Sequence, residues 1–400
     1  MIAALVLAGT YAVIAIGRVP VLRIDRTGAA IIGAILMVVI GGLPFDAAVA
    51  GVDARTIVLL YGMMVLVAHL RMAGFFGLLA QSVATRISSP SVLLVAVVFA
   101  AGILSALFVN DTICLVFAPI VVEAARLTRR SPVPLLLGVA TGSNIGSVAT
   151  ITGNPQNILI GTMSRISYLD FARHLIPVAL IGLALDALVL IVIFRRELSA
   201  GDGPAPHVHD VRVHKPLMIK ALIVAAGMFA AFLAGYDSAL VAAAGAAALL
   251  VTRRVKPERV YRQVDWDLLV LFVGLFVVVA GARHAGLSDD VFALLRPLGI
   301  DTVAGLSLVT AFLSNVISNV PTVMLFAHLM PSFPNPRSAW LTLAMSSTLA
   351  GNLTLVGSIA NLIVVESARK EGVVLTFWDY LKVGVPVTAV TIAIGIWWLG

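Results

Sequence analysis

Two polar stretches break an otherwise strongly apolar sequence, and their side chains could bind a small solute. The first runs Gly142-Ser-Asn-Ile-Gly-Ser-Val-Ala-Thr-Ile-Thr-Gly-Asn-Pro-Gln-Asn157. Gly destabilises a helix and Pro removes a backbone donor, so this stretch interrupts the helix around it. Unpaired backbone groups in hydrocarbon each cost several kcal/mol, so a break is tolerated only where it is buried in protein or lines a polar cavity. We therefore expect this break, and a second one like it, at the centre of a membrane.

Four polar elements are expected to meet there, namely two broken helices and the tips of two hairpins. Their amides and hydroxyls can donate or accept hydrogen bonds. Helix ends add N–H groups for anionic oxygens or carbonyls for cations. Such a site suits a small oxygen-rich solute, neutral or anionic, with or without Na⁺, whereas helix packing is the alternative role for single Ser and Thr residues. The candidate substrate-binding residues are Asn110, Thr112, Ser143, Asn144, Thr152, Asn154, Ser318, Asn319, Asn352, Thr354 and Ser358.

Two carboxylates are candidates for proton or ion coupling. Asp111 lies at the first hairpin tip, and Asp186 lies in the middle of an apolar run. A carboxylate at the membrane centre costs from about 2.5 kcal/mol upward, so it indicates function by default. Asp111 could carry a proton through the transport cycle, or bind Na⁺ when ionised, whereas Asp186 could equally form a structural pair. No Lys or Arg can be placed at the midplane, which favours a neutral or singly charged solute.

Composition places the chain among polytopic membrane proteins. Of its 400 residues, 60% are hydrophobic and 12% charged, against about 25% charged in a typical soluble domain, and the mean hydropathy is +1.06. The net charge of +7 does not indicate a nucleic-acid partner, because the basic residues fall in short loops between apolar runs. The single Cys114 excludes an internal disulfide and a Cys-based metal site. No metal or cofactor is expected, and the lack of a nucleotide-binding loop argues against an enzyme.

Apolar runs of about 17–25 residues, which are long enough to cross a bilayer, recur along the chain. The predicted spans are 2–17, 28–43, 54–70, 132–163, 172–194, 217–234, 238–252, 266–282, 338–365 and 379–399. The apolar stretches 92–128 and 302–330 are interrupted at Asn110-Asp111-Thr112 and at Ser318-Asn319-Val320-Pro321. Residues 71–86 are amphipathic and are expected to lie at the membrane interface. The predicted fold class is therefore an all-α polytopic membrane protein with about ten transmembrane helices and two re-entrant hairpins.

Basic residues set the orientation of these spans. Arg126, Arg129 and Arg130, together with the basic residues of the central loop, fall on one side, which the positive-inside rule assigns to the cytoplasm. Both termini are then outside. This assignment requires 92–128 to enter and leave from the cytoplasmic side, and 302–330 to enter and leave from the outside, as two hairpins dipping from opposite faces.

The two halves of the sequence resemble each other at Gly, Asn, Asp, Arg and Pro rather than at the filler residues of apolar helices. The matched pairs are Val52-Asp53 with Val264-Asp265, Asn110-Asp111 with Ser318-Asn319, 150–157 with 354–361, Asp170 with Asp379, and Pro177 with Pro386. Since each half has an odd number of spans, the second must be inverted, and inverted repeats with broken helices indicate a secondary transporter with a midplane site. Each repeat has five transmembrane helices, a hairpin and a broken span. The predicted division is a first repeat 1–194, a cytoplasmic linker 195–216 with Gly201, Gly203, Pro204 and Pro206, and a second repeat 217–400.

The polar motifs resemble those of the ion transporter superfamily. The motifs are Phe108-Val-Asn-Asp-Thr112, Gly142-Ser-Asn-Ile-Gly146, Thr152-Gly-Asn-Pro-Gln-Asn157, Ile317-Ser-Asn-Val-Pro321 and Gly357-Ser-Ile-Ala-Asn361. The chain looks most like the ArsB-type arsenite/antimonite efflux pumps and related anion permeases, and less like the divalent anion:sodium symporters and the NhaD-type sodium/proton antiporters. Those symporters carry Ser-Asn-Thr at both tips, whereas Asp111 occupies the first tip here, which favours protons over sodium. The resemblance implies scaffold and transport domains that move against each other, a homodimer, and a bacterial inner membrane.

The expected function is secondary active transport, in which arsenite or antimonite is exported in exchange for protons by alternating access. Such an antiporter would confer arsenical resistance, with Asp111 as the coupling carboxylate. Its partners would be a small inorganic oxyacid or anion, protons or Na⁺, and the lipid bilayer. A proton- or sodium-coupled carrier of a small inorganic or carboxylate anion is the alternative, and a gated channel on the same scaffold is a third. Any ATPase subunit that drives export would be a separate chain.

Overall fold

The computed structural model describes residues 1–19, 24–87, 89–128, 130–198, 212–251, 255–287 and 293–400. Within these ranges, six helices are long and apolar enough to cross a membrane, and four shorter apolar helices accompany them. A short antiparallel ribbon, β1 (Arg18–Val19) with β2 (Ile24–Asp25), is the one sheet of the described residues. The predicted residues Arg129, Gly201, Gly203, Pro204 and Pro206 lie outside them. The chain therefore has the nearly all-helical build of a polytopic membrane protein.

The helices of the first half begin and end close to the predicted boundaries. They are α1 (Ile2–Ile16), α2 (Arg26–Val39), α3 (Phe45–Ala50), α4 (Ala54–Met72), α5 (Phe75–Arg86), α6 (Pro90–Leu107), α7 (Asn110–Leu127), α8 (Val133–Ser147), α9 (Pro155–Ser164), α10 (Tyr168–Ile193) and α11 (Arg195–Leu198). The predicted interruption of 92–128 is confirmed between α6 and α7, and the predicted break of 132–163 is confirmed between α8 and α9, around a single turn of 3₁₀ helix. The short α3 was not predicted from the sequence.

The second half of the chain is also helical in the described residues. Its described helices are α12 (Lys215–Leu233), α13 (Ser238–Leu250), α14 (Pro257–Tyr261), α15 (Trp266–His284), α17 (Val303–Ile317), α18 (Asn319–Ala327), α19 (Pro336–Leu349), α20 (Ile359–Lys370) and α21 (Phe377–Leu399). Two 3₁₀ turns, η4 (Ala350–Asn352) and η5 (Leu355–Gly357), fill the break between α19 and α20. The interruption predicted near Ser318 is confirmed between α17 and α18.

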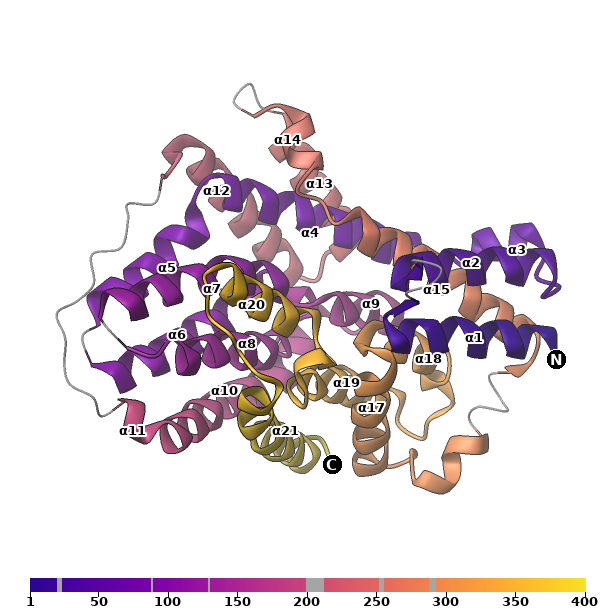
Figure 1. Cartoon of the computed structure of the whole chain (residues 1–400). Helices are drawn as coiled ribbons and strands as arrows, with labels where there is room; N and C mark the ends of the chain where they lie inside the picture. The colour runs from indigo at the N-terminus through magenta and orange to yellow at the C-terminus, as the bar shows by residue number, and fades with distance from the viewer. Residues whose placement is uncertain (20–23, 88, 129, 199–211, 252–254, 288–292) are drawn as a thin grey trace.

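Matched pairs of helices pack together in the two halves. In the first half α8 packs against α6 and α10, and in the second half α19 packs against α17 and α21. The helices after the two hairpin tips cross over, because α7 packs against α20 and α18 packs against α9. Figure 1 shows α6, α8, α7 and α20 in the body of the molecule, α4 and α13 above them, and α15 and α2 on the right. The first segments of the two broken helices, α8 and α19, are buried along most of their length.

The matched aspartates Asp53 and Asp265 perform the same local task. Asp53 accepts a hydrogen bond from the Thr56 N–H at 2.8 Å, and Asp265 accepts one from the Leu268 N–H at 2.9 Å. A side-chain oxygen before the first turn satisfies a backbone donor that the helix leaves unpaired. These residues explain why α4 and α15 begin where they do.

Close contact between α6 and α8 depends on glycine. A Cβ added to Gly146 would lie 2.0 Å from the Gly102 carbonyl oxygen, and one added to Gly142 would lie 2.8 Å from the Val98 carbonyl oxygen. Small residues allow such approach between membrane helices, which gain packing from it. The first hairpin is thereby held tightly against the first broken helix.

Candidate functional site

Asn144 of α8 is the hub of a buried hydrogen-bond cluster. Its Oδ1 accepts from Asn110 Nδ2 at 3.0 Å and from Ser358 Oγ at 3.1 Å. Its Nδ2 donates to Asn352 Oδ1 at 2.8 Å and to Asn361 Oδ1 at 2.9 Å. All four hydrogen-bonding positions of this amide are therefore filled. The contacts join the first hairpin tip, the first broken helix and the second break, which are far apart in sequence.

Backbone carbonyls determine how each Asn amide of the cluster is oriented, that is, which neighbour its Oδ1 and its Nδ2 face. Asn361 Nδ2 donates to the Gly351 carbonyl at 2.7 Å and to the Thr354 carbonyl at 3.2 Å. Since a carbonyl only accepts, Asn361 must turn its Oδ1 towards Asn144. Asn144 then presents its own Oδ1 to Asn110, which must donate through Nδ2. The chain of bonds leaves Asn110 Oδ1 pointing away from Asn144 as a carbonyl acceptor.

The first break is anchored in the same way as the second. Asn157 Nδ2 donates to the carbonyls of Ser147 and Thr150, both at 3.0 Å. These two carbonyls match those of Gly351 and Thr354 in the second half. In each break, one Asn amide therefore donates to backbone carbonyls that the broken helix would leave unsatisfied in hydrocarbon.

Asn154 and Thr152 hold the first break to its neighbours. Asn154 Nδ2 donates to Ser147 Oγ at 2.9 Å and to Thr348 Oγ1 at 3.2 Å, which connects the break to α19. The Thr152 hydroxyl lies 2.8 Å from the Tyr168 hydroxyl at the start of α10. Asn154 also caps α9 through the Asn157 N–H at 2.8 Å. Both residues are fully buried.

The second hairpin tip approaches the cluster through Asn319. A Cβ added to Gly351 would lie 3.3 Å from Asn319 Nδ2 and 3.7 Å from Asn144 Nδ2, so only a small residue fits between the two amides. Ser318 precedes Asn319 with a φ of 78°. A residue with a Cβ in that region carries strain of order 1–3 kcal/mol, which is found where function requires it. Thr354 Oγ1 donates to Asn315 Oδ1 at 3.1 Å and ties the second break to α17.

Two amide carbonyls of the site have no partner in the described part of the chain. They are Asn110 Oδ1 and Asn319 Oδ1, one at each hairpin tip, and the nearby Ser314 Oγ is also unpaired there. Asn110 is 5% exposed, Asn144 2% and Asn319 8%. Buried polar atoms are almost always paired, so each exception requires an explanation. The site is closed to solvent in this conformation and keeps two acceptors free.

The remaining predicted residues take different positions. Ser143 Oγ lies 2.9 Å from Cys114 Sγ, while no hydrogen bond joins Asp111 or Thr112 side chains to the cluster among the described residues. Asp111 and Thr112 are both partly buried. Asp186 is fully buried behind α8, where its Oδ2 lies 2.8 Å from Thr141 Oγ1. The structure thus brings the amides together and leaves the two carboxyls outside the cluster.

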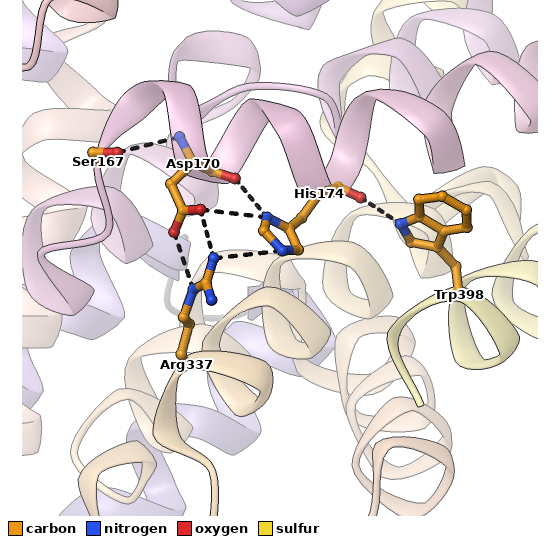
Figure 2. A network of polar contacts seen from close by, with 5 residues as sticks. All are labelled: Ser167, Asp170, His174, Arg337 and Trp398. Carbon is orange, nitrogen blue, oxygen red and sulfur yellow. Dashed lines mark hydrogen bonds and ion pairs between the residues drawn. The ribbon is translucent and has the colours of Figure 1, made fainter.

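A separate polar network joins α10, α19 and α21 (Figure 2). Arg337 donates to Asp170 through Nε at 3.0 Å and through Nη2 at 2.5 Å. His174 Nδ1 contacts the Asp170 carbonyl at 2.8 Å, and Trp398 Nε1 donates to the His174 carbonyl at 2.9 Å. This network links the two halves, and its side chains are partly exposed.

Several residues of the cluster were not among the predicted site residues. Asn157 and Asn361 end the repeated motif in both halves, and their identity at matched positions was a signal in the sequence. Gln156 donates to Thr348 Oγ1 at 3.2 Å. Thr348 lies beside the second break, which marks it in the sequence, whereas Thr141 sits in an apolar helix where nothing in the pattern separates it from packing residues. Only its contacts identify Thr141.

Comparison with known proteins places the chain among transporters. The family model described as citrate transporter (CitMHS) matches residues 11–350. The chain is 33% identical to the silicon efflux transporter LSI3 of Oryza sativa subsp. japonica, covering 94% of this chain and 93% of that protein. It is 25% identical to the putative transporter arsB of Dictyostelium discoideum, covering 94% and 87%. The crystal structure of the Alcanivorax borkumensis YdaH transporter has a similar fold, with a TM-score of 0.61, 16% identity, and coverage of 99% and 95%.

Proposed function

We propose that this chain, which belongs to the citrate transporter family of membrane transporters, exports small neutral oxyacids of the arsenite and antimonite class in exchange for protons. The chain is a transporter and not an enzyme. The substrate would bind between the two hairpin tips and the two breaks. Access would alternate as the site opens first to one side and then to the other.

The free acceptors at the two tips carry this proposal. Asn110 Oδ1 and Asn319 Oδ1 are buried and unpaired among the described residues. Neutral arsenous acid offers O–H donors, which such carbonyl oxygens accept. No Lys or Arg belongs to the described cluster to neutralise a multiply charged anion. An uncharged polyhydroxy substrate fills the free positions without bringing a charge into the membrane.

The relatives support the same class of substrate. One of them is described as a silicon efflux transporter and another as an arsB transporter. Silicic acid and arsenous acid are both small, neutral at physiological pH and rich in hydroxyl groups. A site of amides and hydroxyls that recognises one by accepting its O–H groups fits the chemistry of the other.

A coupled carrier of a small inorganic or carboxylate anion is the second candidate. Four helices begin at the cluster, since α7 starts at Asn110, α9 at Pro155, α18 at Asn319 and α20 at Ile359. Helix N-termini direct unpaired N–H groups and the positive end of the helix dipole towards a ligand, which favours an anion. The family description as citrate transporter agrees with this alternative.

The proposed architecture is a pair of inverted repeats, 1–194 and 217–400, joined by a cytoplasmic linker at 195–216. It would have ten membrane crossings, two hairpins that dip from opposite faces, and both termini outside a bacterial inner membrane. The matched packing of α8 and α19 and the matched bonds of Asn157 and Asn361 support it. The resemblance to the ion transporter superfamily further implies a homodimer, and an ATPase that drives export would be a separate chain.

Asp111 is the proposed coupling carboxylate. It lies in the first turn of α7, next to Asn110 of the cluster. Its side chain has no hydrogen bond or ion pair in the described ranges, so protonation would not break an existing contact. A carboxyl in that position can bind a proton when the site faces one side of the membrane and release it on the other.

Uptake into everted membrane vesicles with an imposed proton gradient tests the proposal. Arsenite, sulfate and citrate are compared with and without Na⁺. Sodium-independent accumulation of arsenite, driven by the gradient, is expected. Sodium-dependent flux of sulfate or citrate without arsenite transport would favour the anion carrier instead, and flux that does not saturate would favour a channel.

Two variants test the assigned residues in the same vesicles. Asn319→Leu keeps the branching and the number of heavy atoms of the side chain but removes its free acceptor together with its amide donor, and should raise the KM for arsenite by a factor of about 3 to 10, the equivalent of one hydrogen bond. Asp111→Asn keeps the shape but removes the titrating group, and should abolish gradient-driven uptake. Asp46→Asn, at an exposed position in α3, is the matched control. Normal gradient-driven uptake by Asp111→Asn would exclude Asp111 as the proton carrier.

A further inference from the structure

Asp186 is a fully buried carboxyl that the substrate cluster does not use. It lies in the second half of α10 with 0% exposure. Its Oδ2 contacts Thr141 of α8, and its Oδ1 has no partner among the described residues. Tyr380 and Thr388, on the neighbouring α21, also carry buried hydroxyls without a partner there. An ionised carboxylate with one hydrogen bond would be very unfavourable in this environment.

The hydrogen-bond geometry around Thr141 indicates whether Asp186 is protonated or ionised. Thr141 Oγ1 lies 2.8 Å from the Leu137 carbonyl and 2.8 Å from Asp186 Oδ2. A hydroxyl has one hydrogen and a carbonyl has none, so Thr141 can donate to only one of them. Both short contacts are separate, full-strength hydrogen bonds only when Asp186 is protonated, donates to Thr141 and lets Thr141 donate to Leu137, since a single hydrogen shared between two acceptors gives two weaker bonds. Ionisation of Asp186 breaks one of the two bonds.

Thr141 also connects Asp186 to the substrate cluster. The Thr141 carbonyl accepts a hydrogen bond from Asn352 Nδ2 at 3.2 Å. Asn352 Oδ1 in turn accepts from Asn144, the hub of the cluster. A change in the hydrogen bonds of Thr141 therefore acts on the residue that holds one side of the hub.

The second half shows that packing does not require this carboxyl. The offset of 209 residues that relates Asp170 to Asp379 also relates Asp186 to Gly395. The offset of 204 that relates Thr150 to Thr354 relates Thr141 to Met345. These two matched residues also meet, because a Cβ added to Gly395 would lie 2.4 Å from Met345 Sδ. The same helix contact is thus apolar in one half and contains a carboxyl in the other.

Few other titratable groups face Asp186. On α21, the buried Tyr380 hydroxyl is the nearby titratable group, and it has no hydrogen-bond partner among the described residues. The helices α6 and α8, which also pack against α10, contain no titratable residue. The other charged residues of α10, α11, α12 and α19 lie towards helix ends. Asp170 and Arg337 belong to the network of Figure 2, and Lys220 of α12 donates to the Val251 carbonyl at 2.7 Å. No cation of the described residues forms an ion pair with Asp186.

We propose that Asp186 and Thr141 form an internal proton-binding site that is occupied while the substrate cluster is closed. Asp186 binds the proton. Thr141 is the positioning residue, because its hydroxyl contacts Asp186 and its carbonyl holds Asn352. When the bundle opens and water reaches the site, the O–H bond of Asp186 breaks and the proton passes to water. Thr141 then turns its hydrogen from Leu137 to the carboxylate, which changes the support of Asn352. The coupling part of this proposal rests on the proposed proton exchange, whereas the occupancy of the site does not.

Infrared spectroscopy of the full chain in lipid vesicles tests the occupancy without any substrate. Wild type should show a C=O stretching band of a protonated carboxylic acid at neutral pH. The band should be absent in Asp186→Asn, and it should move to higher frequency in Thr141→Val, because the carboxyl loses its acceptor. Asp111→Asn serves as the control for the other membrane carboxyl and should leave this band in place. A band unaffected by Asp186→Asn, or unmoved in Thr141→Val, would overturn the proposal.

Transport assays in the same vesicles test the coupling. Asp186→Asn retains a donor towards Thr141 and mimics the protonated form, so it should still exchange arsenite for arsenite while gradient-driven uptake falls at least tenfold. Thr141→Ser, which keeps the hydroxyl, should retain coupling, and Thr141→Val should lose it. Undiminished gradient-driven uptake by both Asp186→Asn and Thr141→Val would reject the coupling role. If wild type moves no arsenite, the proposed substrate fails, while the infrared result still decides the proton site.

Discussion

The two halves of the molecule share a framework but not its chemistry. Asn157 and Asn361 bond the same pair of carbonyls in each break. Yet the first half has Asp111 where the second has Asn319, and it has Asp186 where the second has Gly395. Groups that hold the broken helices are therefore repeated, whereas groups that could carry a proton occur once. The difference separates what the fold requires from what transport requires.

The two hairpins also pack differently. In the first half, Gly102 of α6 contacts Gly146 of α8. The matched positions of the second half hold Thr310 and Ala350. A Cβ added at Gly146 would lie only 2.0 Å from a carbonyl oxygen, so the backbones of α6 and α8 are in direct contact with no space for a side chain between them. We infer that the first hairpin is bound more rigidly to its broken helix than the second.

The largest expected effect comes from giving the first half the residue of the second. Gly146→Ala places a Cβ against the Gly102 carbonyl, so α6 and α8 must move apart, at a cost of about 1–3 kcal/mol or more. The midpoint of thermal unfolding in detergent should fall by several degrees. Ala350→Gly, the reciprocal change, is the control and should leave the midpoint within a degree or two. Equal effects would contradict the difference between the hairpins.

A double replacement makes the core of the first half resemble that of the second. Thr141→Met with Asp186→Gly should fold, because the matched Met345 and Gly395 already pack together and volume-conserving swaps are tolerated best. Gradient-driven arsenite uptake should be lost, while arsenite exchange should persist. Monodispersity in size-exclusion chromatography checks the fold. Retention of gradient-driven uptake would show that the carboxyl asymmetry has no role in coupling.

Asn157 and Asn361 separate anchoring from recognition. Either Ala variant leaves two backbone carbonyls without donors, so each should lower the free energy of unfolding by about 1–3 kcal/mol. Only Asn361→Ala also releases Asn144, since Asn361 Oδ1 is one of its acceptors. The KM for arsenite should therefore rise in Asn361→Ala and stay close to wild type in Asn157→Ala. Similar KM changes in both would mean that the hub is not oriented from the second half.

The smallest effect is expected at the network of Figure 2, where the halves differ once more. Asp170 pairs with Arg337 of the other half, whereas the matched Asp379 forms a capping box with Thr376. The Arg337 side chain is 54% exposed, and exposed ion pairs contribute about 0–1 kcal/mol. Arg337→Gln should lower the unfolding free energy by less than about 1 kcal/mol. Loss of the folded protein would show that this pair is essential for joining the halves.

Much of the fold could be predicted because a membrane restricts what a sequence can do. Apolar runs had to become helices, since every backbone group needs a partner inside the bilayer. Gly153, Pro155 and Pro321 could then mark interruptions, and the residues beside them became site candidates. The matched positions of Asp53 and Asp265, and of Thr150 and Thr354, indicate a relation between the two halves from the sequence alone.

The sequence by itself therefore determined the helices, their breaks and the set of polar groups near the breaks, because these follow from local backbone chemistry and hydropathy. Only the tertiary structure decided which atoms meet. Asn144 became the hub, Asp111 stayed outside the cluster, and Thr141 gained its contact with Asp186. Hydrogen bonds depend on a few tenths of an ångström and on direction. Those are set by how each helix rotates against partners up to 217 residues away, as between Asn144 and Asn361.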